Sequence, residues 1–277
     1  MLRVAGARLL DDRDRAAVRA ALDADPVGTC MVAARVEVAG LDPWRLGGEL
    51  WATGSRLDGI CFSGANLVPL RGNRSALRAF ADRARRRGRG CSSLVGRAEL
   101  VLPLWEDLYH AWSPAREVRA DQPLMVLSGP PLITPDPAVR TVRPDEIERY
   151  LPAAVAMFTE EVGVDPRAGD GGAGYRARVA ELVSAGRAFA RFEGDQVVFK
   201  AEIGALSGTV GQIQGVWVHP DRRGRGLGTS GTAAVAQRLA AMGRVSSLYV
   251  NGFNHVARAA YARIGFTQIG SFATVLF

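Results

Sequence analysis

The residues best suited to chemistry lie in the segment 216–229, which reads Val-Trp-Val-His-Pro-Asp-Arg-Arg-Gly-Arg-Gly-Leu-Gly-Thr. A strand-like apolar run stops at Pro220, and glycines then alternate with larger residues until a helical pattern starts near Leu227. Glycine tolerates positive φ, so successive backbone N–H groups can converge on one point. The helix start adds unpaired N–H groups and the positive end of its dipole. The segment therefore predicts a cradle for a pyrophosphate group, with added charge from Arg223 and Arg225.

Three phosphate-binding patterns compete for this segment. A Walker loop requires Gly-Lys-Ser/Thr, which is missing. A dinucleotide fingerprint requires Gly-x-Gly-x-x-Gly, but Gly224-Arg-Gly226-Leu-Gly228 has the wrong third spacing, and no acidic residue ends the next strand. The third pattern, Arg/Gln-x-x-Gly-x-Gly/Ala, is the acetyl-coenzyme A loop of the GCN5-related N-acetyltransferases, and residues 223–228 match it in full. A plain glycine turn is the simpler interpretation, but strand, proline, arginine, glycines and helix all fall in register.

A second motif follows the loop, in the order Asn254-x-x-Ala257-x-x-x-Tyr261-x-x-x-Gly265-Phe266. It resembles the later motif of the same family, with every anchor present. We expect Asn254 to cap a helix, and helical spacing to place Asn254, Ala257 and Tyr261 along one groove. Gly265 is expected to end the helix in a left-handed cap, and Phe266 to return to the core. The alternative is that Tyr261 is an ordinary half-buried aromatic residue.

The C-terminal half thus resembles a GCN5-related N-acetyltransferase. This resemblance implies a mixed sheet that splays after the strand 212–218, and a pantetheine arm that pairs with the backbone of Val216 and Val218. It also implies acetyl-CoA as cosubstrate and direct transfer of the acetyl group to a primary amine, from a small molecule or a protein, in a ternary complex. The expected coenzyme-binding residues are Val216, Trp217, Val218, Arg223, Gly224, Arg225, Gly226, Leu227, Gly228, Thr229, Asn254, Ala257, Arg258 and Tyr261.

Acyl transfer to an amine needs a base for the amine, polarisation of the thioester and an acid for the leaving thiolate. By its family position, Tyr261 is the expected general acid, and a backbone N–H near Val218 would polarise the carbonyl. The base is less defined, because the glutamate of many relatives is replaced here by Gln212. Our first candidate for the base, in place of that glutamate, is Glu202 on the neighbouring strand. The other substitutes are Glu160, Glu161, the carboxylate of Phe277, and a water relay through Gln212 or His219.

A proline-rich stretch divides the chain into two halves. Residues 128–137 contain four prolines and a glycine, so they interrupt regular structure. The predicted domains are 1–127 and 138–277, joined by the linker 128–137. We predict an α/β (α+β) protein with tandem GNAT-like domains, each a mixed, mostly antiparallel twisted sheet flanked by helices. We expect strands at 30–38, 50–53, 59–63 and 66–70 in the first half, and a closing strand pair at 267–276 in the second.

The N-terminal half is predicted to be degenerate. The stretch from Trp112 to Pro123 resembles the domain of unknown function that precedes such acetyltransferase domains in high-GC bacteria. Its counterpart of the coenzyme loop, residues 67–74, has one glycine instead of three, so we expect no coenzyme there. Aromatic residues gather in this half, and we expect most of them to lie in the core, while one or two could line a cleft. They are Trp44, Trp51, Trp105, Tyr109 and Trp112.

The composition argues against several other classes of protein, namely nucleic-acid-binding, disulfide-rich, metal-binding and membrane proteins. The net charge is +7, but Lys200 is the sole lysine. Arginine, alanine and glycine are abundant, which indicates a GC-rich coding bias more than a surface selected to bind phosphates. We expect no nucleic-acid partner, although the run 83–89 is the best candidate for one. The cysteines Cys30, Cys61 and Cys91 are widely spaced, so we expect neither a disulfide scaffold nor a metal. We predict a cytoplasmic protein without membrane spans, and a homodimer remains open. The rival functions are a non-catalytic acyl-CoA sensor and a nucleic-acid-associated protein.

Overall fold

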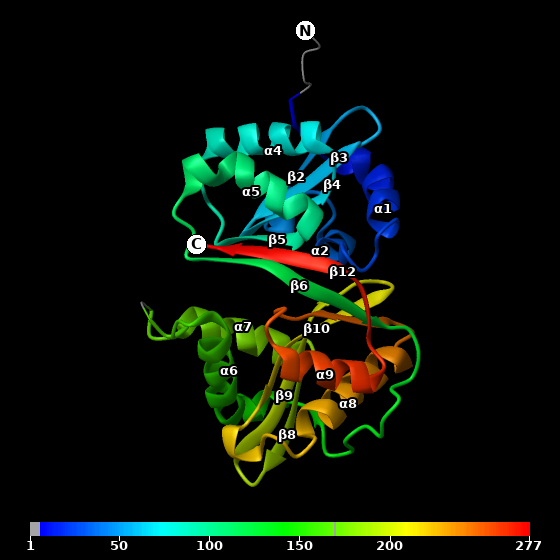
Figure 1. The fold of residues 1–277 in the computed structure, drawn as a ribbon, viewed down its shortest axis with the longest axis vertical. Coiled ribbons are helices and arrows are strands. Elements are labelled where there is room, and N and C mark those ends of the chain that lie inside the picture. Colours follow the sequence, from blue (N-terminus) through cyan, green and yellow to red (C-terminus); the bar gives the residue numbers. More distant parts are fainter. Residues whose placement is uncertain (1–5, 169) are drawn as a thin grey trace. The chain divides into compact units, whose positions relative to one another are not determined.

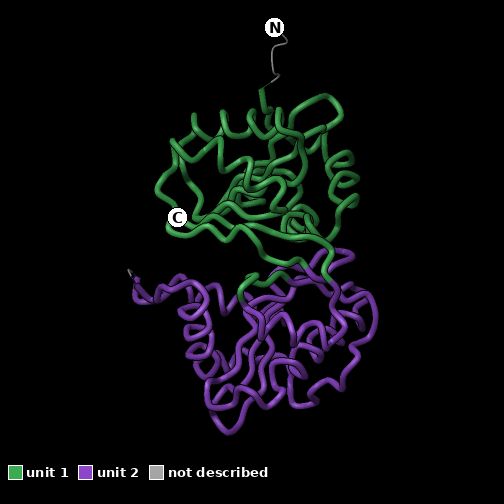
Figure 2. The backbone as a smooth tube through the Cα atoms, viewed as in Figure 1, with its two compact units in different colours: residues 1–124, 249–253, 268–277 green, residues 125–248, 254–267 purple. Residues whose placement is uncertain are grey.

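The computed structural model describes residues 6–168 and 170–277, which form two compact units. The first unit contains the chain up to Leu124 together with two later segments, Tyr249–Phe253 and Gln268–Phe277 (Figure 2). The second unit contains Met125–Leu248 and Asn254–Thr267. The proline-rich stretch 128–137 has no helix or strand, as its composition predicts. The predicted domain boundaries themselves stay a prediction.

The first unit is a mixed sheet with helices on both sides (Figure 1). Its strand order is β1-β2-β3-β4-β5-β12-β6. The pair β4–β5 is parallel, whereas β1–β2, β2–β3, β3–β4 and β5–β12 are antiparallel. The strands are β1 (Arg8–Leu9), β2 (Gly48–Thr53), β3 (Gly59–Gly64), β4 (Asn66–Arg71), β5 (Ser93–Arg97), β6 (Glu117–Leu127) and β12 (Thr267–Leu276). The helices are α1 (Arg15–Asp23), α2 (Cys30–Ala39), α3 (Pro43–Leu46), α4 (Arg74–Arg87) and α5 (Ala98–Trp112).

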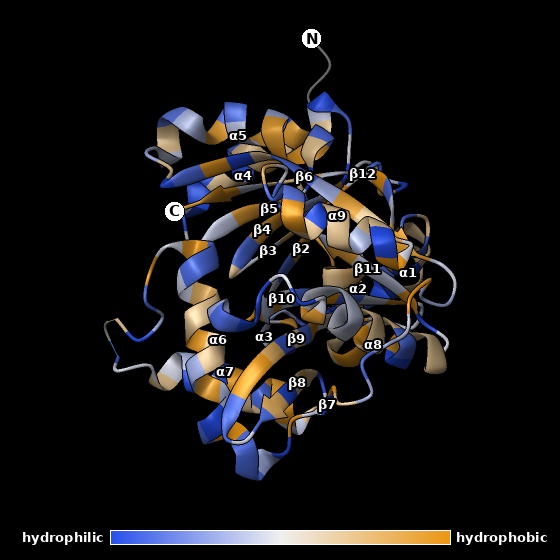
Figure 3. Ribbon diagram, turned by 60° about the horizontal axis from the view of Figure 1, so that its bottom comes forward, coloured by the Kyte–Doolittle hydropathy of each residue, from blue (hydrophilic) through white to orange (hydrophobic). Residues whose placement is uncertain are grey.

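Alternation along the strands divides the core of this unit into two layers. In β2, Trp51 joins the layer that α4 and α5 cover, whereas Leu50 and Ala52 join the layer under α1 and α2. Successive side chains of a strand point to opposite faces, so an apolar strand can fill both layers. Figure 3 shows apolar residues gathered along the strands and on the helix faces that cover them. Burial on both faces fixes the register of the sheet.

The second unit repeats this architecture. Its strand order is β11-β10-β9-β8-β7, with β10–β11 parallel and the other pairs antiparallel. Helices α6 and α7 cover one face, where Tyr150, Met157 and Trp217 are buried together. Helix α8 covers the other face so closely that a Cβ on Gly231 would lie 2.7 Å from the ring of Phe199. The elements are β7 (Arg140–Thr141), α6 (Ile147–Val162), α7 (Ala173–Ser184), β8 (Ala188–Glu193), β9 (Gln196–Leu206), β10 (Val210–Val218), α8 (Leu227–Ala241), β11 (Val245–Tyr249) and α9 (His255–Ile264).

The predicted fold class is confirmed, but two elements differ from their predictions. The segment predicted as a strand at 30–38 is helix α2, and its buried residues Cys30, Ala33 and Val36 recur at helical spacing. Its β-branched residues favoured a strand, and packing against α1 and the sheet overrode that local preference. The closing strand pair at 267–276 is instead the single strand β12, which pairs with β5.

Candidate functional site

Strands β10 and β11 separate within the second unit. Their parallel ladder joins only three residue pairs, from Val210↔Val245 to Gln212↔Ser247, although β10 continues to Val218. Among the described residues, none pairs with the β11-facing edge of residues 213–218 as a strand does. The N–H and C=O groups along this edge are therefore available to an extended ligand. The split lies where the family resemblance predicts the pantetheine arm.

A bulge shapes β10 beside this split. Gln214 pairs with Glu202 and Trp217 with Lys200, so Gly215 and Val216 together face one residue of β9. Gly215 has φ +58°, and a Cβ there would lie 3.0 Å from Met157 Cε and 3.1 Å from Lys200 Nζ. Only glycine adopts this backbone without strain, and an isolated glycine inside a strand is the sequence signal for such a bulge. The bulge is absent from the elements predicted for residues 212–218.

The predicted phosphate loop connects β10 to α8. Gly224 and Gly226 have φ values of +74° and +81°, and a Cβ on either would meet nothing within 4 Å. Gly226 is the N-cap of α8, and no side chain caps the helix. Among the described residues, no acceptor binds the amide N–H groups of residues 224–228. Unpaired amides, an uncapped helix start and open space are the features that an anion requires.

The two arginines of the loop differ in their contacts. Arg225 is exposed beside the open amides. Arg223 instead turns back toward α6, where its Nη2 lies 2.6 Å from Glu160 Oε1 and its Nε donates to the carbonyl of Val218 at 3.1 Å. Glu160 also accepts from the indole of Trp217 at 2.8 Å. This Glu160–Arg223–Trp217 cluster joins the end of β10 to α6, and sequence spacing gave no sign of it.

Helix α9 carries the second motif as its sequence predicts. The side chain of Asn254 caps the helix by accepting from the amide of Ala257 at 3.1 Å. Gly265 ends the helix with φ +107°, and Phe266 is buried. Tyr261 is 8% exposed, and its hydroxyl has no hydrogen-bond partner among the described residues. Burial and, secondarily, the charge of Glu161 raise the pKa of Tyr261, so the phenol stays protonated at neutral pH and can donate a proton.

Glu202 lies in a buried polar network beneath the bulge. Lys200 Nζ lies 2.7 Å from Glu202 Oε1, and the hydroxyl of Tyr150 donates to the same oxygen at 3.1 Å. The amide of Gln214 donates to the second oxygen at 3.4 Å. Desolvation by burial opposes ionisation of Glu202, but Lys200 and the hydrogen bonds outweigh it and lower the pKa of the carboxyl. A carboxylate held in this way is a weak proton acceptor, and its catalytic role stays a prediction.

The remaining candidate bases differ in environment. Gln212 is buried where the parallel ladder ends. His219 is bonded through its Nε2 to Gln196 at 2.9 Å, and its Nδ1 accepts from a backbone amide. Phe277 belongs to the first unit, where its ring packs edge-on against Trp105 and Trp112. Glu160 and Glu161 at the end of α6 are exposed carboxylates, and Glu160 binds Arg223.

The first unit has a counterpart of the split but no open loop. Strands β4 and β5 pair only at Asn66↔Ser93 and Leu67↔Leu94, and helix α5 packs against β4 beyond that point. The side chain of Asn73 caps α4 by accepting from the amide of Ala76 at 3.0 Å. A side chain of the chain itself therefore occupies the start of this helix, and the absence of coenzyme from this unit stays a prediction.

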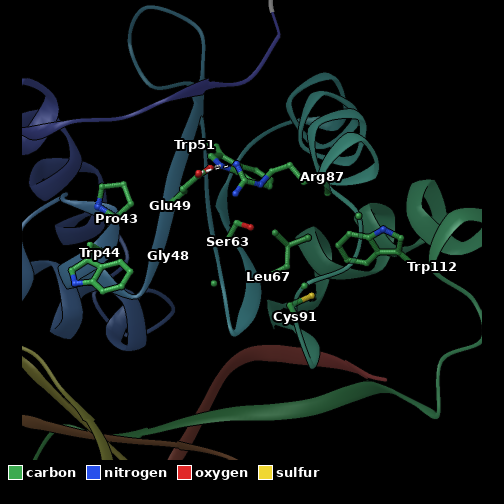
Figure 4. A pocket seen from close by; sticks show the side chains of 14 residues that line it. Pro43, Trp44, Gly48, Glu49, Trp51, Ser63, Leu67, Arg87, Cys91 and Trp112 are labelled. Carbon is green, nitrogen blue, oxygen red and sulfur yellow. Dashed lines mark hydrogen bonds and ion pairs between the residues drawn. The ribbon is translucent and has the colours of Figure 1, made fainter.

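A hollow of about 430 Å³ lies elsewhere in the first unit (Figure 4). Its lining includes Trp51, Trp112 and Glu49, whose carboxylate accepts from the indole of Trp51 at 2.7 Å and from Arg87 at 2.8 Å. The segment predicted as the counterpart of the coenzyme loop, residues 67–74, lies mostly within β4, so only Gly72 and Asn73 connect this strand to α4. The hollow opens at the start of β4, beside Leu67, and not at that connection. The hollow is therefore not the counterpart of the coenzyme site.

The arginine run 83–89 lies at the end of α4, and most of its members have partners within the chain. Arg83 and Arg87 pair with Glu49, Arg85 pairs with Asp82, and Arg89 lies over the ring of Phe277. Charges engaged in this way and placed at a helix C-terminus favour a structural role. Within the described residues, no group of acidic, histidine and cysteine side chains could hold a metal, and no helix could cross a bilayer.

Comparisons with known proteins agree with this architecture. Residues 193–275 match the family described as FR47-like protein, and residues 48–150 match a domain of unknown function, DUF4081. No protein of curated function matches the sequence. A GNAT-family acetyltransferase from Colwellia psychrerythraea is similar in structure, with a TM-score of 0.55 and 11% identity, and the match covers 98% of this chain and 99% of that chain.

Two further structures support the tandem arrangement. A tandem GNAT protein from the clavulanic acid biosynthesis pathway has a TM-score of 0.51 and 16% identity, with 97% of each chain covered. A GCN5-related N-acetyltransferase from Kribbella flavida has a TM-score of 0.54 and 15% identity, covering 89% of this chain and 95% of that chain. At these identities the similarity establishes the fold, and the family resemblance of both halves is confirmed.

Proposed function

We propose that this chain, which has the tandem fold of the GCN5-related N-acetyltransferases, is an acyltransferase that moves an acetyl group from acetyl-CoA to a primary amine. The observation that carries the proposal is the uncapped start of α8, where the amides of residues 224–228 have no acceptor among the described residues. The split beside residues 213–218 provides room for an extended arm next to it. In the first unit the corresponding helix is capped by Asn73, and helix α5 packs against β4.

The residues of the second unit fit the coenzyme. The amides of residues 224–228 and the charge of Arg225 would hold the pyrophosphate, and the backbone of Val216 and Val218 would pair with the pantetheine arm. The bound coenzyme supplies an acetyl thioester for direct transfer to the amine in a ternary complex. The remaining members of the predicted coenzyme site are Trp217, Arg223, Leu227, Thr229, Asn254, Ala257 and Arg258.

Tyr261 is proposed as the general acid. Its raised pKa keeps the hydroxyl protonated, and a protonated phenol can donate to a leaving thiolate. A backbone N–H near Val218 would stabilise negative charge on the thioester oxygen. Glu202 was the first candidate for the base, but its partners Lys200 and Tyr150 favour a role in holding the charge and shape of the bulge over a direct proton transfer.

The test uses the full chain with acetyl-CoA and a panel of primary amines, including polyamines, amino sugars and peptides. Calorimetry should detect binding of coenzyme A to monodisperse protein, and mass spectrometry should detect an acetylated amine together with release of coenzyme A. Product detection by mass avoids a thiol reagent, which the half-buried Cys91 could consume. Absence of coenzyme binding would contradict the proposal.

A second candidate function rests on Gln212, because an amide cannot take a proton from the acceptor. This residue favours a non-catalytic acyl-CoA sensor. The two functions differ in one outcome of the same experiment. A sensor binds coenzyme A without amine-dependent release of the thiol, whereas a transferase shows both.

A further inference from the structure

Glu160 occupies an unusual place at the end of α6. Its two oxygens lie 2.6 and 2.9 Å from Arg223 Nη2, and one of them accepts from the indole of Trp217 at 2.8 Å. Arg223 opens the predicted phosphate loop, so a carboxylate of the chain itself is bound to a cation that the coenzyme would also attract.

The contact between Glu160 and Arg223 is suited to exchange. The side chains are 50% and 48% exposed, respectively, and ion pairs at this exposure contribute little to stability. Arg223 bonds only two groups among the described residues, Glu160 and the carbonyl of Val218. Phosphate oxygens bind arginine as strongly as a carboxylate does and can engage two of its N–H groups. A pyrophosphate at the neighbouring amides would therefore compete with Glu160 for Arg223.

We propose that Glu160 is a positioning residue that holds Arg223 in the free protein and yields it to the pyrophosphate of the coenzyme. Glu160 then keeps its hydrogen bond to Trp217 and presents an uncompensated negative charge beside the end of β10. This charge attracts a protonated amine, so the site selects cationic acceptors after the coenzyme has bound. The inference rests on the proposed function and deepens it, because it names cationic amines as the substrate class.

The first test measures the affinity of the full chain for coenzyme A by calorimetry in three proteins. Glu160→Gln keeps an acceptor for Trp217 and removes the charge that competes for Arg223, so we expect the Kd to fall three- to tenfold. Glu148→Gln is the control, because it removes the same charge from the other end of the same helix, where Glu148 pairs with Arg176. We expect its Kd to stay within twofold of that of the parent.

The second test repeats the substitution in an Arg223→Ala background, where Glu160→Gln should change the Kd by less than twofold. A merely structural role of Glu160 would weaken coenzyme binding in either background. The inference is overturned if Glu160→Gln binds coenzyme A no more tightly than the parent, or if Glu148→Gln tightens binding equally. Failure of the proposed function looks different, since the parent itself would then give no binding heat.

The substrate class is tested with the amines that the parent acetylates. In a kinetic comparison at saturating acetyl-CoA, Glu160→Gln should raise the KM of a protonated polyamine at least fivefold and change kcat less than twofold. The KM of an amine carrying a neighbouring carboxylate should rise less than twofold. Equal changes for the two amines would overturn the assignment of cationic acceptors.

Discussion

The two units place the same elements in the same order but fill the split between their parallel strands differently. In the second unit the N-cap of the helix after the split strand is Gly226, whereas in the first unit it is Asn73, whose side chain accepts from the amide of Ala76. Tyr261 lies seven residues after the N-cap of α9, and Leu104 lies seven residues after the N-cap of α5, so the two positions correspond. Leu104 is fully buried in the apolar core. A few side chains thus distinguish an uncapped helix start beside a buried tyrosine from a capped helix start beside an apolar core.

The strand that pairs with the split strand also differs between the two units; it is β3 in the first unit and β9 in the second. Both units have a register shift between these strands, between Ile60 and Cys61 in the first unit and between Gln214 and Trp217 in the second. Two side chains of β3 that share one face, Ile60 and Phe62, are apolar and buried, whereas the two of β9 that share the face under α6 are the ion pair of Lys200 and Glu202. A buried ion pair is weak evidence for stability, so its presence in one unit alone indicates a function for the charge beside the bulge.

The largest expected effect comes from breaking this ion pair. Lys200→Met leaves Glu202 ionised and unpaired in the interior, which costs about 3–5 kcal/mol in the free energy of unfolding at neutral pH. Denaturant unfolding measures this loss. The double variant Lys200→Met/Glu202→Met makes the site apolar like that of the first unit and should recover most of the stability, and a double variant as unstable as the single one would contradict the comparison.

The ion pair of Lys200 and Glu202 also predicts how the free energy of unfolding depends on pH, with opposite signs in the parent and in Lys200→Met. In the parent the folded pKa of Glu202 lies below its unfolded value, so its contribution is present above about pH 4.5 and is lost as the pH falls through the folded pKa. In Lys200→Met, burial raises the pKa above the unfolded value. The stability deficit of the variant should therefore shrink between pH 7 and pH 5, and a constant deficit would show that Glu202 is not the cause.

The next prediction concerns the hydroxyl of Tyr261, which its counterpart Leu104 lacks. We expect Tyr261→Phe to lower kcat about 100-fold, the lower part of the range for general acid–base groups, while the Kd for coenzyme A changes less than threefold. Steady-state kinetics and calorimetry separate these quantities. Unchanged turnover in the variant would remove Tyr261 from the mechanism.

A smaller effect is expected at the loop. Gly226→Val places a β-branched residue at φ +81°, a conformation whose strain is about 1–3 kcal/mol, and it obstructs the amides that face the anion. We expect the affinity for coenzyme A to fall about 30-fold. Leu57, the described non-glycine residue with positive φ, gives a control in Leu57→Val, which should lower stability and leave the affinity unchanged.

The smallest effect concerns the filled counterpart of the loop. Asn73→Ala removes the side chain that caps α4, which costs about 1 kcal/mol and lowers Tm by about 2–4 °C for a chain of this size. Calorimetric scans measure the shift. We expect no change in the affinity for coenzyme A, and a measurable gain of a second coenzyme site would show that Asn73 alone closes the loop of the first unit.

The sequence by itself determined the open glycine loop before α8, the cap at Asn254 and the left-handed end at Gly265, because each depends on backbone rules that act within a few residues. It also predicted most strands and helices. It misassigned α2, where apolar β-branched residues suit either state until tertiary packing chooses between them.

Only the tertiary structure brought together residues far apart in the chain. Glu160 and Arg223 meet because α6 lies along β10, and Lys200 binds Glu202 because both point to the face that α6 covers. Such contacts leave no periodic signal in the sequence, since the spacing between partners is set by loop lengths and sheet register. The sequence therefore located the place where a coenzyme could bind, and the packing of helix on sheet decided which charges surround it.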